Sequence, residues 1–193
     1  MASFDFKALS QSLDPPLWIV TASHGAQRGG LLATFVNQAS IAESCPRILA
    51  GIAKSHHTWD LIEAAGSFAV HLLTASRQHL DWAERFGLES SCQIDKFARL
   101  SSRAGVTGSP ILEAATGWAE CRVESRLDTG DRTIYLAEVV DAKAPDSADI
   151  LTVQRWVKTL SSERLAKLEA QFNADSVTDE LAIRAWRRQR ELD

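Results

Sequence analysis

Two stretches of alternating apolar and polar residues, joined by a tight turn, constrain the fold of this chain most strongly. Residues 118–125 (WAECRVES) place small apolar side chains on one face and charged side chains on the other. A period of two is the pattern of a half-buried strand. Residues 128–131 (DTGD) supply turn formers, and residues 133–142 (TIYLAEVVDA) return as a second strand. The pair predicts an antiparallel hairpin and therefore a fold built on antiparallel sheet.

Short apolar runs separated by turn residues extend this pattern over the first half of the chain. The runs predicted to be strands are residues 17–22, 31–37, 48–53 and 67–73, and the glycine-rich residues 24–30 are predicted to be a turn. Ser55 and Ser76 are predicted to cap two short helices that end at Gly66 and Gly87. Six or seven antiparallel strands with short helical crossovers indicate a barrel.

The last part of the chain differs in character from the barrel. Residues 149–193 contain neither glycine nor proline and carry helical runs at 153–160, 162–172 and 179–191. We therefore predict a barrel domain over residues 1–145 and a C-terminal helical extension over residues 146–193, packed on the barrel or on a partner subunit.

Charge and cysteine content limit the classes of function. A net charge of -4 argues against a general nucleic-acid binder, which needs basic surface to meet phosphates. No apolar run is long enough to cross a bilayer, so no membrane role is expected. Three dispersed cysteines without a CxxC pair argue against a disulfide framework and against a zinc site. A reducing, cytoplasmic location is expected.

Common catalytic motifs are absent from the sequence, which has no GxSxG elbow, no P-loop and no GxGxxG fingerprint. His56 and His57 are adjacent, so on a helix they point about 100° apart and form a poor chelating pair. We therefore assign no catalytic residue and no metal ligand from the sequence.

Residues 54–58 (KSHHT) lie at a predicted junction between a strand and a helix. A helix start offers free backbone N–H groups and a partial positive charge. Lys54 and the hydroxyls of Ser55 and Thr58 would add donors, and the combination suits a phosphate monoester. Alternatively, Ser55 only caps the helix and Lys54 is solvated, and the segment taken alone favours that interpretation.

A second candidate segment, residues 33–40 (ATFVNQAS), runs from an apolar strand into polar residues. Asn37, Gln38 and Ser40 offer donors and acceptors to the edge of a heterocycle. A strand end that simply leaves the core explains the same pattern equally well. His71 lies inside a predicted apolar strand, where a single histidine is more often a hydrogen-bonded core residue than a ligand.

Taken in order, the motifs of residues 17–142 resemble those of the flavin reductase-like, FMN-binding split-barrel family. The family shows a strand ending in VT, a glycine-led strand entering a polar cradle, a proline before an apolar strand, and the motifs DKF and G-x-P-x-L. A GD-[HR]…EVV hairpin follows. The matching segments here are residues 18–21, 30–40, 46–53, 95–97, 108–112 and 130–140. This chain departs from the family at His71, where Asn is frequent, and at Arg132, where His often follows GD.

The resemblance implies a mainly β, antiparallel split barrel that binds FMN at the interface of a homodimer, with NADH or NADPH as electron donor to the flavin. A partner monooxygenase or another acceptor would take the electrons onward. The residues implied in cofactor binding are Thr34, Phe35, Val36, Asn37, Gln38, Ser40, Lys54, Ser55, His57, Thr58 and Arg132. Two alternatives stay open: an FMN-binding electron carrier or sensor with little reductase activity, and a cofactor-free barrel that binds proteins through its helical tail.

Overall fold

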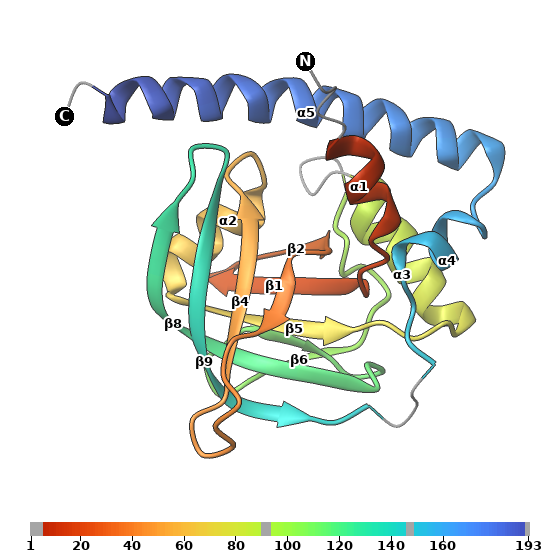
Figure 1. Ribbon diagram of the computed structural model, residues 1–193. Helices are drawn as coiled ribbons and strands as arrows, with labels where there is room; N and C mark the ends of the chain where they lie inside the picture. The colour runs from red at the N-terminus through yellow and green to blue at the C-terminus, as the bar shows by residue number, and fades with distance from the viewer. Residues whose placement is uncertain (1–5, 90–93, 146–148, 192–193) are drawn as a thin grey trace.

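The computed structural model describes residues 6–89, 94–145 and 149–191, and Figure 1 shows how their elements are arranged. In chain order these elements are α1 (Phe6–Ser12), β1 (Trp18–His24), β2 (Gln27–Ala33), β3 (Val36–Gln38), β4 (Arg47–Ala53), α2 (His57–Ala65), β5 (Ser67–Leu72), α3 (Arg77–Leu88), β6 (Ser102–Ala104), β7 (Pro110–Leu112), β8 (Gly117–Asp128), β9 (Arg132–Lys143), α4 (Val153–Val157) and α5 (Ser162–Arg190).

Seven of these strands form one antiparallel sheet in the order β2-β1-β5-β8-β9-β4-β3. The two edge strands, β2 and β3, are consecutive in the chain and are separated only by Thr34 and Phe35. The sheet must therefore curl until its two edges approach each other, although β2 and β3 do not pair in this sheet. The predicted antiparallel split barrel is confirmed, and β6 and β7 form a separate small hairpin.

The predicted hairpin of β8 and β9 is the longest pair in the sheet. β8 and β9 have 12 residues each, and Asp128 pairs with Thr133 at the turn. The register shifts once between Glu120 and Cys121 and again between Val123 and Ser125. Such irregularities bend a strand and increase its twist, which helps a sheet to curl.

Alternate side chains of β1 point to opposite faces of the sheet and contribute to two different hydrophobic cores. Val20 and Ala22 point into the barrel, together with Phe68 and Tyr135. Ile19 points to the opposite face, where a second core packs the sheet against the helices. The buried members that this second core draws from α3 and α4 are Trp82, Ala83, Phe86, Leu88 and Trp156.

The glycines Gly29 and Gly30 lie inside β2, so the turn predicted for residues 24–30 is wrong over most of its length. Both glycines pair with β1. A Cβ at Gly30 would come within 2.6 Å of the Phe86 ring, so close packing, not turn geometry, requires glycine there. The strand predicted over residues 31–37 is also interrupted, because the chain bends at Thr34 and Phe35 to reach the other edge of the sheet.

The predicted cap of α3 is confirmed, whereas the predicted cap of α2 is wrong. The Ser76 hydroxyl accepts a hydrogen bond from the backbone N–H of His79. α2 instead has His56 at its N-cap, with no hydrogen bond from that side chain, and Ser55 lies one residue further out. Gly66 ends α2 in the left-handed region at φ +66°, as predicted.

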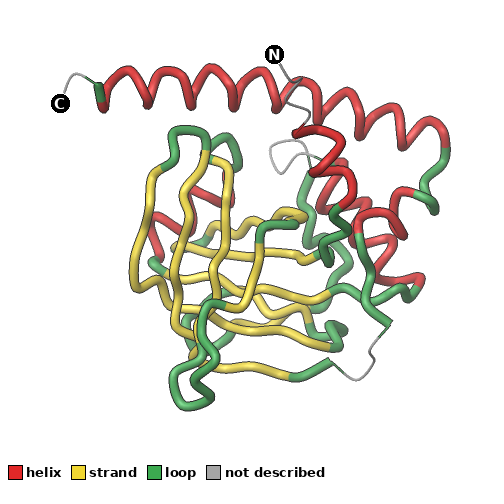
Figure 2. The backbone as a smooth tube through the Cα atoms, viewed as in Figure 1, coloured by secondary structure: helices red, strands yellow, loops and turns green. Residues whose placement is uncertain are grey.

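The C-terminal extension contains one continuous helix, α5, where the sequence pattern predicts separate runs. α5 has 29 residues, which corresponds to about 44 Å of helix. It lies across one end of the barrel and projects beyond it, as Figures 1 and 2 show. None of its described residues is fully buried. No helix in the described part of the chain is both long and apolar enough to cross a membrane.

Candidate functional site

Lys54 lies where β4 runs towards α2, beside the turn between β8 and β9. We call this the α2 end of the barrel, and it faces α5 in Figure 1. The Lys54 backbone N–H donates to the carbonyl of Asp131 at 2.9 Å. Its Nζ donates to Asp128 Oδ1 at 2.7 Å, and this hydrogen bond lowers the pKa of the Asp128 carboxyl. The predicted phosphate ligand Lys54 is thus held in place and is already paired.

The start of α2 carries unused hydrogen-bond donors. Among the described residues, the backbone N–H groups of His57 and Thr58 have no acceptor. The Thr58 hydroxyl is buried, with the residue 1% exposed, and also has no partner in the described structure. Ser55 is exposed next to them. Such a cluster of donors at a helix start suits an anion.

Arg132, the first residue of β9, and Phe35, in the bend between β2 and β3, come together beside this helix start. The Arg132 guanidinium lies 4.8 Å from the centre of the Phe35 ring. Phe35 is packed over Gly51 of β4, since a Cβ there would be 3.2 Å from the Phe35 Cβ. Arg132 also donates from Nη2 to Asp179 Oδ2 at 2.8 Å, so α5 reaches the site. The predicted residue Thr34 is half-buried at the bend preceding Phe35.

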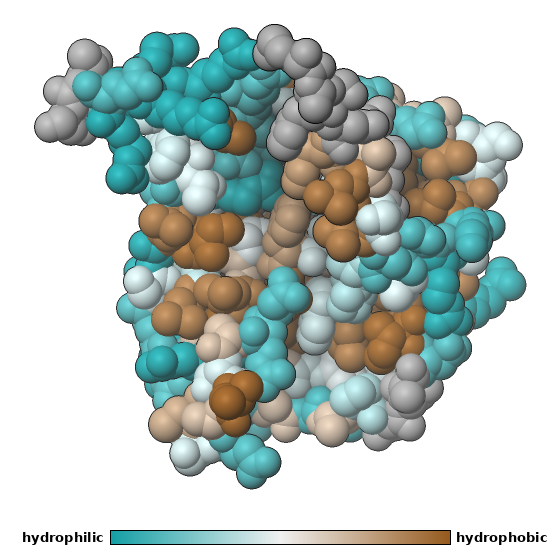
Figure 3. Space-filling model, in the orientation of Figure 1, coloured by the Kyte–Doolittle hydropathy of each residue, from teal (hydrophilic) through white to brown (hydrophobic). Residues whose placement is uncertain are grey.

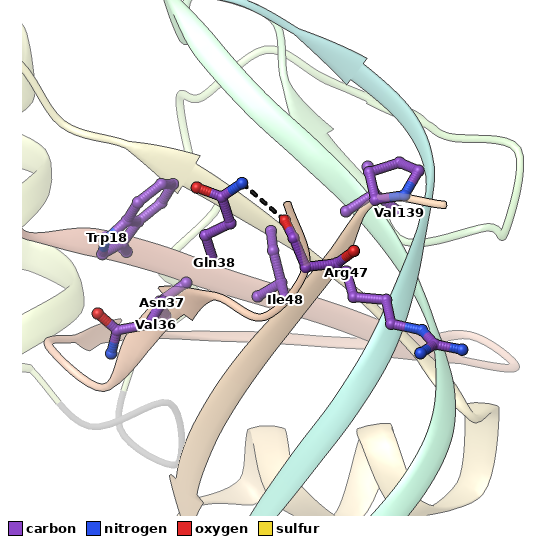
Figure 4. Close-up of a pocket in the computed structure, with 9 residues that line it drawn as sticks. Trp18, Val36, Asn37, Gln38, Arg47, Ile48 and Val139 are labelled. Carbon is purple, nitrogen blue, oxygen red and sulfur yellow. Dashed lines mark hydrogen bonds between the residues drawn. The ribbon is translucent and has the colours of Figure 1, made fainter. Parts of the chain in front are cut away.

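The remaining predicted residues line a hollow beside β3, near the end of β4 that lies away from α2. We call this the β3 hollow; its volume is about 290 Å³ and Figure 4 shows its walls. Its lining residues are Trp18, Val36, Asn37, Gln38, Ser40, Pro46, Arg47, Ile48 and Val139. The Gln38 amide donates to the Ser40 carbonyl at 2.7 Å, whereas the exposed Asn37 amide has no partner among the described residues.

The structure therefore divides the predicted residues into two groups along one strand. Gln38 pairs with Ile48 at one end of β4, and Arg132 pairs with Ala53 at the other. At about 3.4 Å per residue, the two ends are roughly 17 Å apart. The two groups lie towards opposite ends of β4, and an elongated ligand lying along β3 and β4 would reach both. The arginine that lines the hollow, Arg47, is paired with Glu124, whereas the donors without a partner in the described structure lie at the α2 end.

His56 was not among the predicted site residues, yet it occupies the N-cap of α2. It keeps contact with solvent, but the protein around it displaces enough water to lower the pKa of its imidazole. Asp175 opposes this shift and is the largest of the charged contributors, followed by Lys96 and Asp179. His56 thus marks where α5 approaches the helix start. In the sequence, only its position directly before the helix could have marked His56 as a candidate site residue.

His71 has a structural role. It is completely buried, its Nδ1 lies 3.1 Å from the Ile19 carbonyl, and its Nε2 accepts from the Leu112 N–H at 3.1 Å. The interpretation of His71 as a hydrogen-bonded core residue is supported. Within the part of the chain that the structure describes, no group of three or more His, Cys, Asp or Glu side chains is arranged to hold a metal ion.

These features define a class of protein: a split barrel that gathers anion-suited donors beside an aromatic ring. Comparison with known proteins identifies the family to which this split barrel belongs. The flavin reductase like domain matches residues 10–161. An FMN reductase (NADH) of Pseudomonas syringae is 31% identical over 146 residues, covering 76% of this chain and 79% of that protein. The chain belongs to the flavin reductase-like family, and the predicted resemblance is confirmed.

Solved structures support the same assignment of the fold. Nitrilotriacetate monooxygenase component B from Mycobacterium thermoresistibile is 25% identical, with a TM-score of 0.64 over 76% of this chain and 79% of that one. A flavin reductase domain protein from Arthrobacter sp. FB24 is 23% identical and has a TM-score of 0.68, over 78% of this chain and 89% of that one. Because the family segment stops at residue 161, α5 lies outside it.

Proposed function

We propose that this chain is an NAD(P)H-dependent flavin reductase that binds FMN along β3 and β4, with the phosphate at the start of α2. The observation that carries the proposal is Thr58, a buried hydroxyl without a partner in the described structure, beside two free backbone N–H groups. A phosphate monoester would supply acceptors for these donors. The FMN reductase of Pseudomonas syringae supports FMN as the ligand and NADH as one donor.

The residues present fit FMN in distinct ways. Lys54, Ser55, His57 and Thr58 would hold the phosphate. Thr34, Phe35, Val36, Asn37, Gln38 and Ser40 would contact the remainder of the molecule. Arg132, which pairs with Ala53 next to Lys54, would place positive charge beside the phosphate. When bound, FMN supplies the redox chemistry by accepting a hydride from the nicotinamide. The chain's own residues bind and orient the reactants, so the proposed reaction requires no protein acid or base.

Replacing Thr58 by valine tests the phosphate site without disturbing a hydrogen bond of the apoprotein. Valine has nearly the same shape, and the lost hydroxyl has no partner in the described structure. We expect the Thr58→Val free energy of unfolding to stay constant or to rise by about 1 kcal/mol. FMN affinity should fall roughly tenfold, while riboflavin affinity should not change, because riboflavin lacks the phosphate. Flavin fluorescence titration measures both affinities.

A matched control is Thr21→Val, which removes another buried threonine hydroxyl. The Thr21 hydroxyl donates to the Pro110 carbonyl at 2.6 Å, so this variant should lose about 1–3 kcal/mol of stability. Its ratio of FMN to riboflavin affinity should match that of the wild type. Equal losses of FMN and riboflavin affinity in Thr58→Val would contradict a phosphate site at α2.

Anaerobic mixing of the FMN-loaded protein with NADH and with NADPH tests the reductase activity. Bleaching of the flavin absorbance by either nicotinamide is expected, and the faster one identifies the preferred donor. Stable FMN binding without reduction by either nicotinamide would instead indicate an electron carrier or sensor. Failure to bind any flavin would reject the proposed function.

The proposed functional unit is a homodimer in a reducing, cytoplasmic environment. Exposed apolar side chains in and beside α1, β3 and β4 support a second copy as the occupant of this face; they are Phe6, Leu9, Leu13, Phe35 and Leu49. Apolar areas are visible on the same face in Figure 3. Exposed Cys45 and buried Cys121 are free thiols, which suits a reducing compartment. Light scattering gives the mass that tests the dimer.

The final electron acceptor and the domain boundary also belong to this proposal. A partner monooxygenase is supported by the similarity to nitrilotriacetate monooxygenase component B. The barrel domain would end near residue 145, with residues 146–193 as a helical extension. Leu151 and Trp156 nevertheless lie in the second core, so the first part of the extension is well anchored to the barrel.

A further inference from the structure

α5 brings a carboxylate onto the arginine of the proposed flavin site. Asp179 Oδ2 accepts from Arg132 Nη2 at 2.8 Å, and the two side chains are 24% and 21% exposed. Asp131, which is more deeply buried, binds Nε of the same guanidinium. Two sides of the Arg132 guanidinium are therefore occupied by carboxylates of the chain itself, one of them from outside the family segment.

The position of Asp179 is fixed by the way α5 rests on the hairpin between β8 and β9. A Cβ at Gly130 would lie 2.8 Å from the Trp186 Cβ and 3.1 Å from the Ile183 Cα. Asp179 is one helical turn before Ile183 and so lies on the same face of α5. The first turns of α5 form ion pairs with Glu89, just after α3. α5 is thus attached on both sides of the proposed site.

The positive charges around Arg132 are outnumbered by the carboxylates that pair with them. Lys54 and Arg132 contribute two positive charges, whereas Asp128, Asp131 and Asp179 contribute three negative ones. Desolvation raises the pKa of the Asp179 carboxyl, and Asp131 adds to the rise against the opposing effect of Arg132. A phosphate dianion entering this end would meet Asp179 as a competitor for the same guanidinium.

We infer that Asp179 is a specificity-determining residue, which competes with the flavin phosphate for Arg132 and so limits the preference of the site for FMN over unphosphorylated flavin. This inference rests on the proposed function. The backbone places Arg132 at the start of α2, because Arg132 pairs with Ala53 and the neighbouring Lys54 N–H donates to the Asp131 carbonyl. Riboflavin shares the flavin ring but carries no phosphate, so Asp179 should not affect it in the same way.

The test is the ratio of FMN to riboflavin affinity in Asp179→Asn. Asparagine keeps the size of the side chain and removes its charge. We expect FMN affinity to rise about tenfold, at the lower end of typical coupling between two sites, and riboflavin affinity to change by less than about twofold. Asp179→Glu keeps the charge and should retain a ratio near that of the wild type.

Glu180→Gln is the matched control on the same helix. It removes an equal charge one residue away, from a side chain that pairs with Arg184 on the exposed surface. Its affinity ratio should equal that of the wild type. A wild-type or lower ratio in Asp179→Asn would overturn the inference while leaving FMN binding intact. Absence of flavin binding in the wild type and in all variants would reject the proposed function and the inference together.

Discussion

Gly130 meets two requirements at a single position in the turn between β8 and β9. Its φ of +96° lies in the region that side chains other than glycine rarely adopt, and its Cα faces the backbone of α5. Gly25, in the turn between β1 and β2, has a φ of +59° but open space around it. The two glycines therefore separate backbone strain from the contact with α5.

We expect Gly25→Ala to lower the free energy of unfolding by about 1 kcal/mol, from backbone strain alone. Gly130→Ala should lower it by about 2–4 kcal/mol, since the new methyl group also collides with Trp186 and Ile183. Amide hydrogen exchange should accelerate around residues 179–186 only in Gly130→Ala. Equal exchange rates in the two variants would show that α5 does not depend on this contact.

Single residues also show where prediction from the sequence stops. Arg132 was predicted because it follows a turn next to a recognisable GD pair. Its partner Asp179 lies 47 residues further along the chain, in a helix without a continuous apolar face. No local sequence pattern determines where such a helix packs, so the ion pair between Arg132 and Asp179 could not be predicted from the sequence.

At the scale of elements, two serines before helices look alike in sequence and differ in role. The Ser76 hydroxyl accepts from the His79 N–H at 3.2 Å, whereas α2 starts from His56 without a side-chain cap. The predicted capping role of Ser55 failed because α2 begins two residues later than the serine. The failure leaves the Ser55 hydroxyl available to a ligand.

Alanine substitutions distinguish the two serines. Ser76→Ala should lower the free energy of unfolding by about 1 kcal/mol, the usual value of an N-cap. Ser55→Ala should change the free energy of unfolding by less than about 0.5 kcal/mol, because an exposed side chain that caps no helix contributes little to stability. The same variant should weaken FMN binding. Urea denaturation measures the free energy of unfolding of each variant, and FMN titration measures its affinity for FMN. A stability loss in Ser55→Ala equal to that in Ser76→Ala would restore the capping interpretation.

For the whole molecule, periodicity predicted the antiparallel sheet but not how its edges are arranged. The pattern in β8 and β9 is local, and hairpin pairing follows from it. The bend at Thr34 and Phe35, which separates the two edges of the sheet, and the close packing of Gly30 against Phe86 are both tertiary features that no local pattern specifies. The two groups of candidate site residues were likewise identified by type, while their separation along β4 depends on tertiary register.

His71 links three strands of the molecule and makes its stability depend on pH. Its Nε2 accepts from the Leu112 N–H, so the proton of the neutral ring lies on Nδ1 and points to the Ile19 carbonyl. Burial lowers the pKa of His71 from 6.5 to about 4. The unfolded chain therefore binds a proton more readily, and stability that is complete above about pH 6.5 is lost as the pH falls towards 4.

The shift in the pKa of His71 corresponds to about 3 kcal/mol of stability lost between neutral pH and pH 4. His71→Asn removes this titration and retains one donor and one acceptor, so its loss on acidification should be smaller than that of the wild type. Burial also lowers the pKa of His79, which leaves some pH dependence in the variant. Urea unfolding at about pH 7.5 and about pH 4.5 measures the difference. His24→Asn, at an exposed position, should behave like the wild type, and an equally large acid loss in His71→Asn would exclude His71 as its source.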